Sequence, residues 1–434
     1  MEDNQSYLKK FLETNKTKIL SIIKQSDIKA QILDDKNEED MKQAGELLRN
    51  GKLVSFPTET VYGLGANALD EEAVKSIFLA KNRPLTDPVI VHIDKKEDGL
   101  NFVEITPGIK EVYDFLADNF WPGPLTMILK ANFNIIPRVV TAQTDFVGIR
   151  CPQHEVARRL IRIAQRPIAA PSANLFAHVS PTSAVHVFND FYDQNISIIN
   201  DPVQELPSCE FGIESTVVKI EEIASSNQQE NSKFNLVILR FGSLSGEQIA
   251  QAISKSDQFK DRITIVKKKK ENKVAEHIHS EAPGQLLKHY SPYINCYLFH
   301  LRSSDDKQDL KYPLLNDINI KESIIFDYKN QTEHLKDKCM KYISLSEKGD
   351  MREIMTKLYD SLRWAENVDA AKNILIYNID HHYTHLEGID TQKVEFLETV
   401  YDKIFRSTSG KKILYDQEND KFYLVEQHTE DSHN

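Results

Sequence analysis

Two stretches of the sequence combine side chains that suit ligand binding, and the first is FPTETVYGLG at residues 56–65. An apolar run ends at Pro57, which cannot donate a hydrogen bond within a sheet, so a strand should stop there. The hydroxyls of Thr58 and Thr60, the carboxylate of Glu59 and two glycines follow at once. Glycines let a chain turn sharply or approach a ligand closely. Polar groups at a strand end mark the place where open α/β sheets bind ligands.

The second stretch, KNRPLTDPVIVHI at residues 81–93, adds positive charge. Lys81 and Arg83 are separated by one residue, and a short apolar run that carries His92 follows them. A surface turn with a solvated basic corner would explain either stretch by itself. Together, the two stretches favour one polar pocket with a basic wall.

Other predicted strand ends in the first half of the chain also carry polar side chains. Arg150 ends the run VGIR and Arg240 ends the run LVILR, while Ser172 follows a third strand and Ser215 begins a fourth. An arginine at the end of an apolar strand is costly to bury unless it meets an anion, and an internal salt bridge is the alternative. The set is rich in cations and poor in paired carboxylates. It therefore suits a polyanion such as a nucleoside triphosphate, whose developing charge the cations would stabilise.

The sequence lacks the motifs of several other chemistries. It contains no GxxxxGK[ST] P-loop, no evident Ser-His-Asp order and no evident reactive cysteine. The four cysteines are too widely spaced for a zinc site. HHYTH at residues 381–385 has no cysteine or carboxylate pair beside it, so we predict no metal ligands in the protein. These features indicate catalysis by positioning and electrostatics, without a covalent enzyme intermediate.

The elements that would position these residues alternate between helix and strand from residue 41 onward, which predicts an α/β fold. The expected helices of the first half are 41–50, 71–80, 107–120 and 155–164. The expected strands are 53–56, 89–93, 147–150, 168–170, 196–199, 215–220 and 236–240. Residues 121–129 are expected to be a Pro/Gly turn that leads into a further strand. A second α/β unit begins near residue 295, with strands at 323–328, 373–379 and 411–416 and helices at 352–365 and 393–405.

Length and composition indicate a protein with more than one domain. A chain of 434 residues predicts two or three domains, and 40% hydrophobic with 27% charged residues describes a globular protein with a sizeable core. Residues 1–37 have helical spacing and predict a helical extension. Residues 255–282 are polar and predict a linker. Their KKKK run at 267–270 favours a solvated linker over a nucleic-acid site, because acids follow it at once.

The net charge and the N-terminal sequence indicate which partners and which cellular compartment to expect. The net charge of -11 argues against a protein that coats nucleic acid. The first residues carry early acids and no apolar core of a signal peptide. No apolar run approaches the roughly 20 residues that span a bilayer. We therefore predict a cytoplasmic protein, in a reducing compartment, with no membrane association.

Eight motifs of the chain resemble the YrdC/Sua5 family of threonylcarbamoyl-AMP synthases. They are FPTETVYGLGANAL, the KxRP to VHI block, FWPGPLT, VGIRCP, PSAN with SPT following, GIESTVV, LRFG and APGQLLKHYSP, and they cover roughly residues 40–292. LYDSLRWAENVDAAKNILI and the region of VYDKIFRSTSGK are similar to the C-terminal Sua5 domain. The resemblance implies the longer, two-domain Sua5 form.

The same resemblance implies an architecture for each part of the chain. Residues 38–254 would form a YrdC-like twisted open mixed sheet with helices and a basic cavity. Residues 255–292 would be a linker that folds back over the active site, and residues 293–434 a smaller, Rossmann-like α/β domain.

The family's reaction is implied in the same way. It condenses L-threonine, bicarbonate and ATP, the last with Mg²⁺, to threonylcarbamoyl-AMP and pyrophosphate, which makes the enzyme a nucleotidyltransferase. A partner threonylcarbamoyl transferase complex then modifies adenosine 37 of tRNAs that read codons beginning with A. The enzyme itself would meet tRNA only indirectly, or bind RNA weakly.

Site residues carry over motif by motif. The implied L-threonine contacts are Thr60, His92, Arg150 and Ser215. The implied ATP contacts are Lys81, Arg83, Asp87, Ala170, Ser172, Ser180, Arg240 and Tyr290, of which Lys81 and Arg83 would neutralise the leaving pyrophosphate. An arginine can fork onto the carboxylate of the amino acid.

The chain departs from the family pattern at a few positions. Asp87 stands where the family commonly has Asn, and Gln285 and Leu287 stand where a Met and an aromatic residue are more usual. Three other functions compete with the synthase: a nucleic-acid-binding module, carbamoyl transfer in hydrogenase maturation, and a sugar-phosphate lyase. The net charge disfavours the first. The second would bring zinc-finger cysteines and the third a clustered acidic metal site, and neither is found in the sequence.

Overall fold

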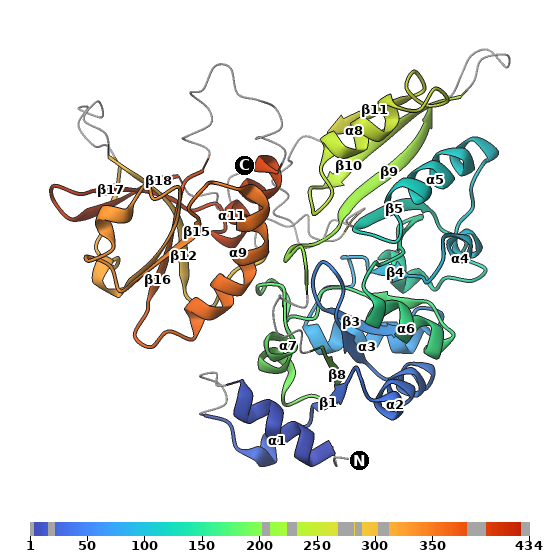
Figure 1. Cartoon of the computed structure of the whole chain (residues 1–434), viewed down its shortest axis with the longest axis horizontal. Coiled ribbons are helices and arrows are strands. Elements are labelled where there is room, and N and C mark those ends of the chain that lie inside the picture. Colours follow the sequence, from blue (N-terminus) through green and yellow to red (C-terminus); the bar gives the residue numbers. More distant parts are fainter. Residues whose placement is uncertain are drawn as a thin grey trace. The chain divides into compact units, whose positions relative to one another are not determined.

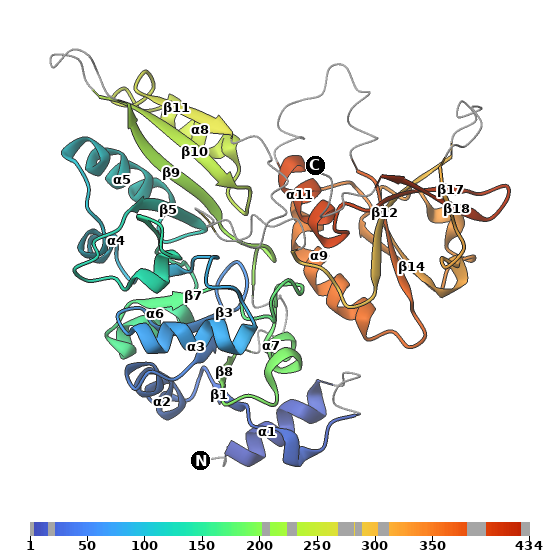
Figure 2. The same cartoon turned by 180° about the vertical axis from the view of Figure 1, so that it is seen from behind.

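The computed structural model describes residues 4–15, 22–201, 209–223, 232–267, 282, 289–302, 312–379 and 396–426. The described residues form two compact units. The first contains the described residues up to Phe176, those from Ser180 to Lys267, and Ala282; the second contains Ala177–Val179 and the described residues from His289 onward. Each unit is α/β, as predicted (Figure 1, Figure 2).

Eleven described strands build the mixed sheet of the first unit. They are β1 (Gln31–Asp34), β2 (Val54–Phe56), β3 (Gly63–Asn67), β4 (Ile90–His92), β5 (Leu125–Lys130), β6 (Phe146–Arg150), β7 (Ile168–Ala170), β8 (Ser197–Asn200), β9 (Thr216–Ile223), β10 (Lys233–Arg240) and β11 (Ile263–Lys267). Their order is β1-β8-β2-β3-β7-β4-β6-β5-β9-β10-β11. Strands β4 and β6 are parallel, whereas β5 is antiparallel to β6.

Helices cover both faces of this sheet. They are α1 (Asn4–Thr14), α2 (Glu38–Arg49), α3 (Glu71–Lys81), α4 (Lys96–Gly99), α5 (Pro107–Phe120), α6 (Glu155–Ala164), α7 (Ala184–Phe191) and α8 (Gly246–Ser254), with 3-10 turns at Gln25–Asp27, Leu100–Phe102 and Arg138–Thr141. Helices α2 and α6 pack on each other and share one core cluster, while α3 and α5 belong to another. Ile32 and Leu33 of β1 divide between the two clusters, as consecutive strand residues must when both faces are covered.

Local signals explain where the helices begin. Asn37 caps α2 and Asp70 caps α3, each by accepting hydrogen bonds from two backbone amides of the first turn. Thr106 caps α5, and Pro107 occupies its first position, where a missing N–H is harmless. The cap of α3 matters for the site because this helix ends in Lys81.

The glycine-rich end of the first motif is a strand, whereas the sequence suggested a turn or a ligand approach. Gly63 and Gly65 lie in β3, which pairs with β2, and neither glycine has a positive φ. A Cβ at Gly65 would lie 2.7 Å from Ile168 Cγ2 and 2.8 Å from Phe56 Cε1. Close packing against these side chains, and not a special backbone conformation, requires glycine at position 65.

Two other segments differ from the sequence prediction. Residues 1–37 were expected to be helical, but only α1 and a 3-10 turn are helical in the described part, and β1 joins the sheet beside β8. Within the predicted linker, β11 pairs in parallel with β10. The sheet therefore extends beyond the predicted catalytic segment at both of its edges.

The second unit has a central sheet that is largely parallel, as predicted for a Rossmann-like domain. Its elements are β12 (Asn295–Leu301), β13 (Leu314–Leu315), β14 (Ser323–Tyr328), β15 (Lys341–Ser346), β16 (Asn373–Tyr377), β17 (Lys412–Asp416), β18 (Lys421–Glu426), α9 (Met351–Glu366) and α11 (Leu397–Ser407), with 3-10 turns at Ile320–Glu322 and Glu333–Leu335. The strand order is β13-β18-β17-β12-β16-β14-β15. Phe299, Ile325, Leu375 and Ile413 lie in its own core cluster.

All four cysteines are free thiols. Burial raises the pKa of Cys151 to about 12, and burial also raises the pKa of Cys209 and Cys296. A buried thiol with a raised pKa stays protonated and is a poor nucleophile. Among the described helices, none is both long enough and apolar enough to cross a bilayer.

Candidate active site

Strand β2 ends at Phe56, and the residues after it form a buried turn held by Thr58. Thr58 Oγ1 accepts hydrogen bonds from the backbone amides of Thr60 and Val61, each at 3.2 Å, and donates to the Val61 carbonyl at 2.7 Å. Thr60 Oγ1 lies 2.8 Å from Thr58 Oγ1. A hydroxyl bonded to its own backbone stabilises a turn without a regular ladder. The turn holds Glu59 and Thr60 at the end of the strand.

Arg150, the last residue of β6, forms a buried ion pair with Glu59. Arg150 Nη2 donates to Glu59 Oε1 at 2.6 Å, and the two side chains are 5% and 3% exposed. Glu59 Oε2 accepts hydrogen bonds from the backbone amides of Gln153 and His154 at 3.0 and 3.3 Å, just before α6. Arg150 Nε is buried and has no hydrogen-bond partner among the described residues. The internal salt bridge is thus present, but it leaves one donor of the guanidinium open.

His92 lies beside Arg150, because β4 and β6 place the two residues in register. His92 Nδ1 is 3.3 Å from the Ile168 carbonyl. A carbonyl can only accept, so Nδ1 carries the proton and Nε2 remains an acceptor. Burial, assisted by the charge of Arg150, lowers the pKa of His92 to about 3. The site therefore contains a neutral imidazole and not an additional cation.

Ser215 connects this region to Arg240. Ser215 Oγ lies 2.8 Å from Thr126 Oγ1 and accepts a hydrogen bond from Arg240 Nη2 at 3.0 Å. Arg240 Nε donates to the Ser215 carbonyl at 3.1 Å. The sheet explains the proximity, since Thr126 of β5 and Arg240 of β10 both align with Val217 of β9.

Lys81 stands at the C-terminal end of α3 and is 1% exposed. Its Nζ donates to the Ser172 carbonyl at 2.6 Å and to the Asn174 carbonyl. A carbonyl oxygen orients an ammonium but carries no net charge to neutralise it. These two carbonyls fix the position of the ammonium, which also lies close enough to Asp87 to lower the pKa of that carboxyl.

Arg83 and Asp87 form a second buried ion pair. Arg83 Nη2 lies 2.9 Å from Asp87 Oδ2, although neither carboxylate oxygen has the alignment of a hydrogen bond. Arg83 also donates to the carbonyls of Asp87 and Pro88 at 3.1 and 2.8 Å. Burial raises the pKa of Asp87, while Arg83, Lys81 and Arg240 act to lower it. Three cations and one carboxylate thus lie near one another, which makes this region positive when Asp87 is ionised.

Three further residues predicted to bind ATP lie in the first unit. Ser180 Oγ donates to Glu214 Oε1 at 2.6 Å, and Glu214 directly precedes Ser215. Ala170 ends β7, and Ser172 pairs with Gly63 in an isolated bridge. Of these residues, Ser172 contacts one of the cations, because its carbonyl accepts a hydrogen bond from Lys81 Nζ.

Tyr290 belongs to the second unit. Its hydroxyl lies 3.3 Å from Lys403 Nζ, and its ring is tilted against that of Tyr359 at 5.3 Å between centroids. Its predicted contact with ATP stays a prediction.

The predicted set omits three polar residues that the structure ties to it: Glu59, Glu214 and Thr126. The two glutamates were visible in motifs, since Glu59 lies between the two threonines of PTET and Glu214 directly precedes Ser215. Acids inside cation-rich motifs are natural counter-ions, and that signal would have identified both glutamates. Thr126 ends the FWPGPLT motif, but its contact with Ser215 follows only from the pairing of β5 with β9.

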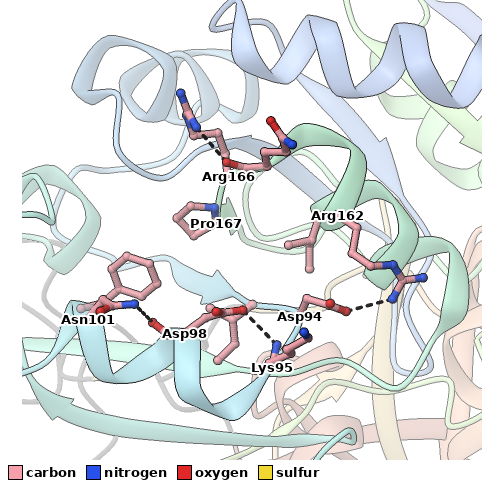
Figure 3. Close-up of a pocket in the computed structure, with 11 residues that line it drawn as sticks. Asp94, Lys95, Asp98, Asn101, Arg162, Arg166 and Pro167 are labelled. Atoms are coloured by element: carbon pink, nitrogen blue, oxygen red, sulfur yellow. Dashed lines mark hydrogen bonds and ion pairs between the residues drawn. The ribbon is translucent and has the colours of Figure 1, made fainter.

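A further cavity, of about 340 Å³, lies next to the end of β4 (Figure 3). Its lining residues are Ile93, Asp94, Lys95, Asp98, Asn101, Phe102, Ile161, Arg162, Gln165, Arg166 and Pro167. Asp94 Oδ1 lies 3.1 Å from Arg158 Nε and 3.0 Å from Arg162 Nη1, so this carboxylate joins the end of β4 to α6. None of the predicted substrate contacts lines this cavity.

Within the part of the chain that the structure describes, no group of three or more His, Cys, Asp or Glu side chains is arranged to hold a metal ion. The HHYTH stretch at residues 381–385 lies outside the described residues, as do Gln285 and Leu287. The predictions made for them stay predictions.

Two family models match the chain. The Sua5_yciO_yrdC model, described as "Telomere recombination", matches residues 46–229. The Sua5_C model, described as "Threonylcarbamoyl-AMP synthase, C-terminal domain", matches residues 244–407.

Individual relatives are similar in sequence and in structure. A threonylcarbamoyl-AMP synthase of Pyrococcus abyssi is 41% identical over 249 residues, which are 57% of this chain and 64% of that protein. The Bacillus subtilis synthase is 40% identical over 217 residues, 50% of this chain and 57% of that protein. Both matches span less than two thirds of the relative. A crystal structure of P. abyssi Sua5 complexed with L-threonine has a TM-score of 0.64 at 30% identity and covers 89% of this chain and 99% of that one.

Proposed function

This chain belongs to the Sua5/YrdC family, and from that membership we propose that it is a threonylcarbamoyl-AMP synthase. It condenses L-threonine, bicarbonate or CO2, and ATP to threonylcarbamoyl-AMP and pyrophosphate. The reaction makes it a nucleotidyltransferase, because an adenylyl group passes from ATP to a carbamate oxygen.

The observation that supports the proposal most is that the first unit carries two chemically different polar regions, one at the ends of β2, β4 and β6 and one at the end of α3. At the first, Arg150 retains an open Nε donor beside a neutral His92 whose Nε2 accepts. Apart from its amine, L-threonine has two polar groups, a carboxylate and a hydroxyl. The carboxylate can accept from the arginine, and the hydroxyl can donate to the imidazole. Thr60 follows Glu59, the partner of Arg150, in the buried turn, and the hydroxyl of Ser215 contacts Arg240; both are further proposed contacts of L-threonine.

The second region suits a triphosphate. Lys81, Arg83 and Arg240 all lie close enough to the Asp87 carboxylate to lower its pKa. Cations held in fixed positions stabilise the charge that develops as pyrophosphate leaves. Mg²⁺ enters with ATP as part of that substrate. Arg240 also contacts Ser215, so the two regions meet at this pair of residues.

The order of steps follows from the chemistry of the substrates. The ammonium of bound L-threonine first loses a proton to water, and the neutral amine then attacks CO2. Loss of a second proton from the nitrogen to water leaves the carbamate. A carbamate oxygen then attacks the α-phosphorus of ATP, and the bond to the β-phosphate oxygen breaks with release of pyrophosphate. Lys81 and Arg83 hold the phosphates through the step.

The product and the partners belong to the same proposal. Threonylcarbamoyl-AMP is a mixed anhydride, so its threonylcarbamoyl group needs an acceptor. The acceptor is adenosine 37 of tRNA, and a threonylcarbamoyl transferase complex catalyses the transfer. The synthase itself works in the cytoplasm, and cell fractionation would test that location.

The deciding experiment measures pyrophosphate release by purified full-length protein and searches for threonylcarbamoyl-AMP by mass spectrometry. Release is expected only when ATP, L-threonine and bicarbonate are all present. Release that is independent of L-threonine and bicarbonate would refute the proposal.

A further inference from the structure

Glu59 occupies a position that only a carboxylate can fill. It accepts hydrogen bonds from Arg150 Nη2, from Gln153 N and from His154 N, and its side chain is 3% exposed. All three partners are donors. A glutamine would have to turn its own NH₂ toward one of them, because its amide has a single acceptor oxygen.

The carboxylate also sets the charge at this end of the site. Glu59 and Arg150 cancel each other, and His92 is neutral because burial depresses its pKa. The hydroxyls of Thr58 and Thr60 add polarity without charge. By contrast, the region around Lys81 and Arg83 keeps an excess of positive charge.

Resting on the proposed function, we propose that Glu59 is a specificity-determining residue of the amino-acid pocket. It cancels the charge of Arg150, so that the pocket accepts a zwitterionic amino acid and disfavours a simple carboxylate anion. The ammonium of a zwitterion compensates the negative charge that its carboxylate brings, whereas an anion leaves that charge in contact with Glu59. The open Nε of Arg150 remains the donor for the carboxylate of the amino acid.

This selectivity has a consequence for a reaction with anionic co-substrates. Bicarbonate and ATP are both anions, and a buried arginine without a counter-ion would attract either of them. Glu59 disfavours the binding of these anions at Arg150. Arg150 therefore binds the amino acid, and bicarbonate and ATP bind elsewhere in the site.

The test compares two ligands that share a carboxylate and a 3-hydroxyl. L-Threonine carries an ammonium, and 2,3-dihydroxybutanoate of matching configuration has a hydroxyl in its place. Affinities are measured by calorimetry on the full chain without ATP, at neutral pH. The wild type is expected to prefer L-threonine by tenfold or more, and Glu59→Gln is expected to reduce that ratio by about tenfold.

The ratio of the two affinities separates the effect of the charge of Glu59 from any change in the position of Arg150. Any misplacement of Arg150 in Glu59→Gln weakens the shared carboxylate contact and cancels between the two ligands. Glu59→Asp keeps the charge and is expected to keep the preference, whatever its effect on absolute affinity. Asp94→Asn removes a different buried carboxylate, one that pairs with Arg158 and Arg162, and is expected to leave the ratio unchanged.

Each outcome has one meaning. A ratio in Glu59→Gln equal to that of the wild type overturns the inference, as does an equal loss in Glu59→Gln and Glu59→Asp. If circular dichroism shows that Glu59→Gln is not folded, the two affinities of the wild type test the inference. Equal affinity of the wild type for both ligands overturns it. A wild type that binds no L-threonine at all refutes the proposed function instead.

Discussion

His92 is buried between strands and beside a cation, so we expect it to stay uncharged at every physiological pH. Its pKa is about 3, against an ordinary value near 6.5. The Cε1–H resonance of His92, assigned by its loss in His92→Gln, should keep its neutral position from pH 8 to pH 5. A titration with a midpoint near 6.5 would contradict this assignment.

The same depressed pKa makes His92 a source of acid lability. The unfolded chain takes up a proton at His92 below pH 6.5, whereas the folded chain does not until about pH 3. Between these values the unfolded state binds more protons, so the free energy of unfolding falls as the pH falls, by up to about 1.4 kcal/mol per pH unit. Urea unfolding at pH 6.5 and pH 5 should therefore show a smaller loss in His92→Gln than in the wild type.

Asp87 brings a negative charge to the region that we assign to the triphosphate. It pairs with Arg83 at 2.9 Å, and an asparagine amide oxygen would still face this arginine. Asp87→Asn should tighten ATP binding by roughly threefold to tenfold, because a repulsive charge is removed and the cations remain. Calorimetry with ATP measures the change, with L-threonine affinity as the control. Weaker ATP binding would show that Asp87 itself contacts the nucleotide or its metal.

At the scale of elements, the packing of β3 against β2 and β7 distinguishes its two glycines. A methyl group at Gly65 would lie within 3.0 Å of Phe56, Ile168 and a backbone oxygen, whereas at Gly63 the nearest atoms lie at 3.3 Å. Gly65→Ala should therefore cost about 1–3 kcal/mol of stability through overpacking, and Gly63→Ala distinctly less. Thermal unfolding of the two variants checks the difference. Equal melting temperatures would show that the strand relaxes freely.

The same contrast explains which elements the sequence could predict. Helices α5 and α6 match their predicted bounds of 107–120 and 155–164, because caps and apolar periodicity are local signals. Strands β1 and β11 were not predicted. They are short strands at the two edges of the sheet, and a short edge strand has a weak pattern of its own until its neighbour is known.

The candidate site divides in the same way. An arginine at the end of an apolar strand was predicted to meet an anion, with an internal salt bridge as the alternative, and Arg150 does form a salt bridge with Glu59. This partner was not predicted, because Glu59 and Arg150 are 91 residues apart in the sequence. Which acid meets which arginine depends on strand order, and no local pattern carries that information.

At the scale of the whole molecule, the chain consists of two units, each with hydrophobic cores of its own. All the predicted L-threonine contacts lie in the first unit: Thr60, His92, Arg150 and Ser215. A ligand stabilises the cooperative unit that binds it, by about 2.7 kcal/mol at 100 times its dissociation constant. Stabilisation by L-threonine should therefore be confined to the first unit.

Hydrogen exchange with mass spectrometry on the full chain would locate that stabilisation. Saturating L-threonine should slow exchange in peptides from β4, β6 and β9 and leave peptides from β14 and β16 unchanged, because slowed exchange follows the opening free energy of each unit. Arg150→Ala is the matched control, and it should abolish the protection because it removes the carboxylate anchor. Equal protection of both units would mean that they open as one cooperative body, and protection in the second unit alone would place L-threonine elsewhere.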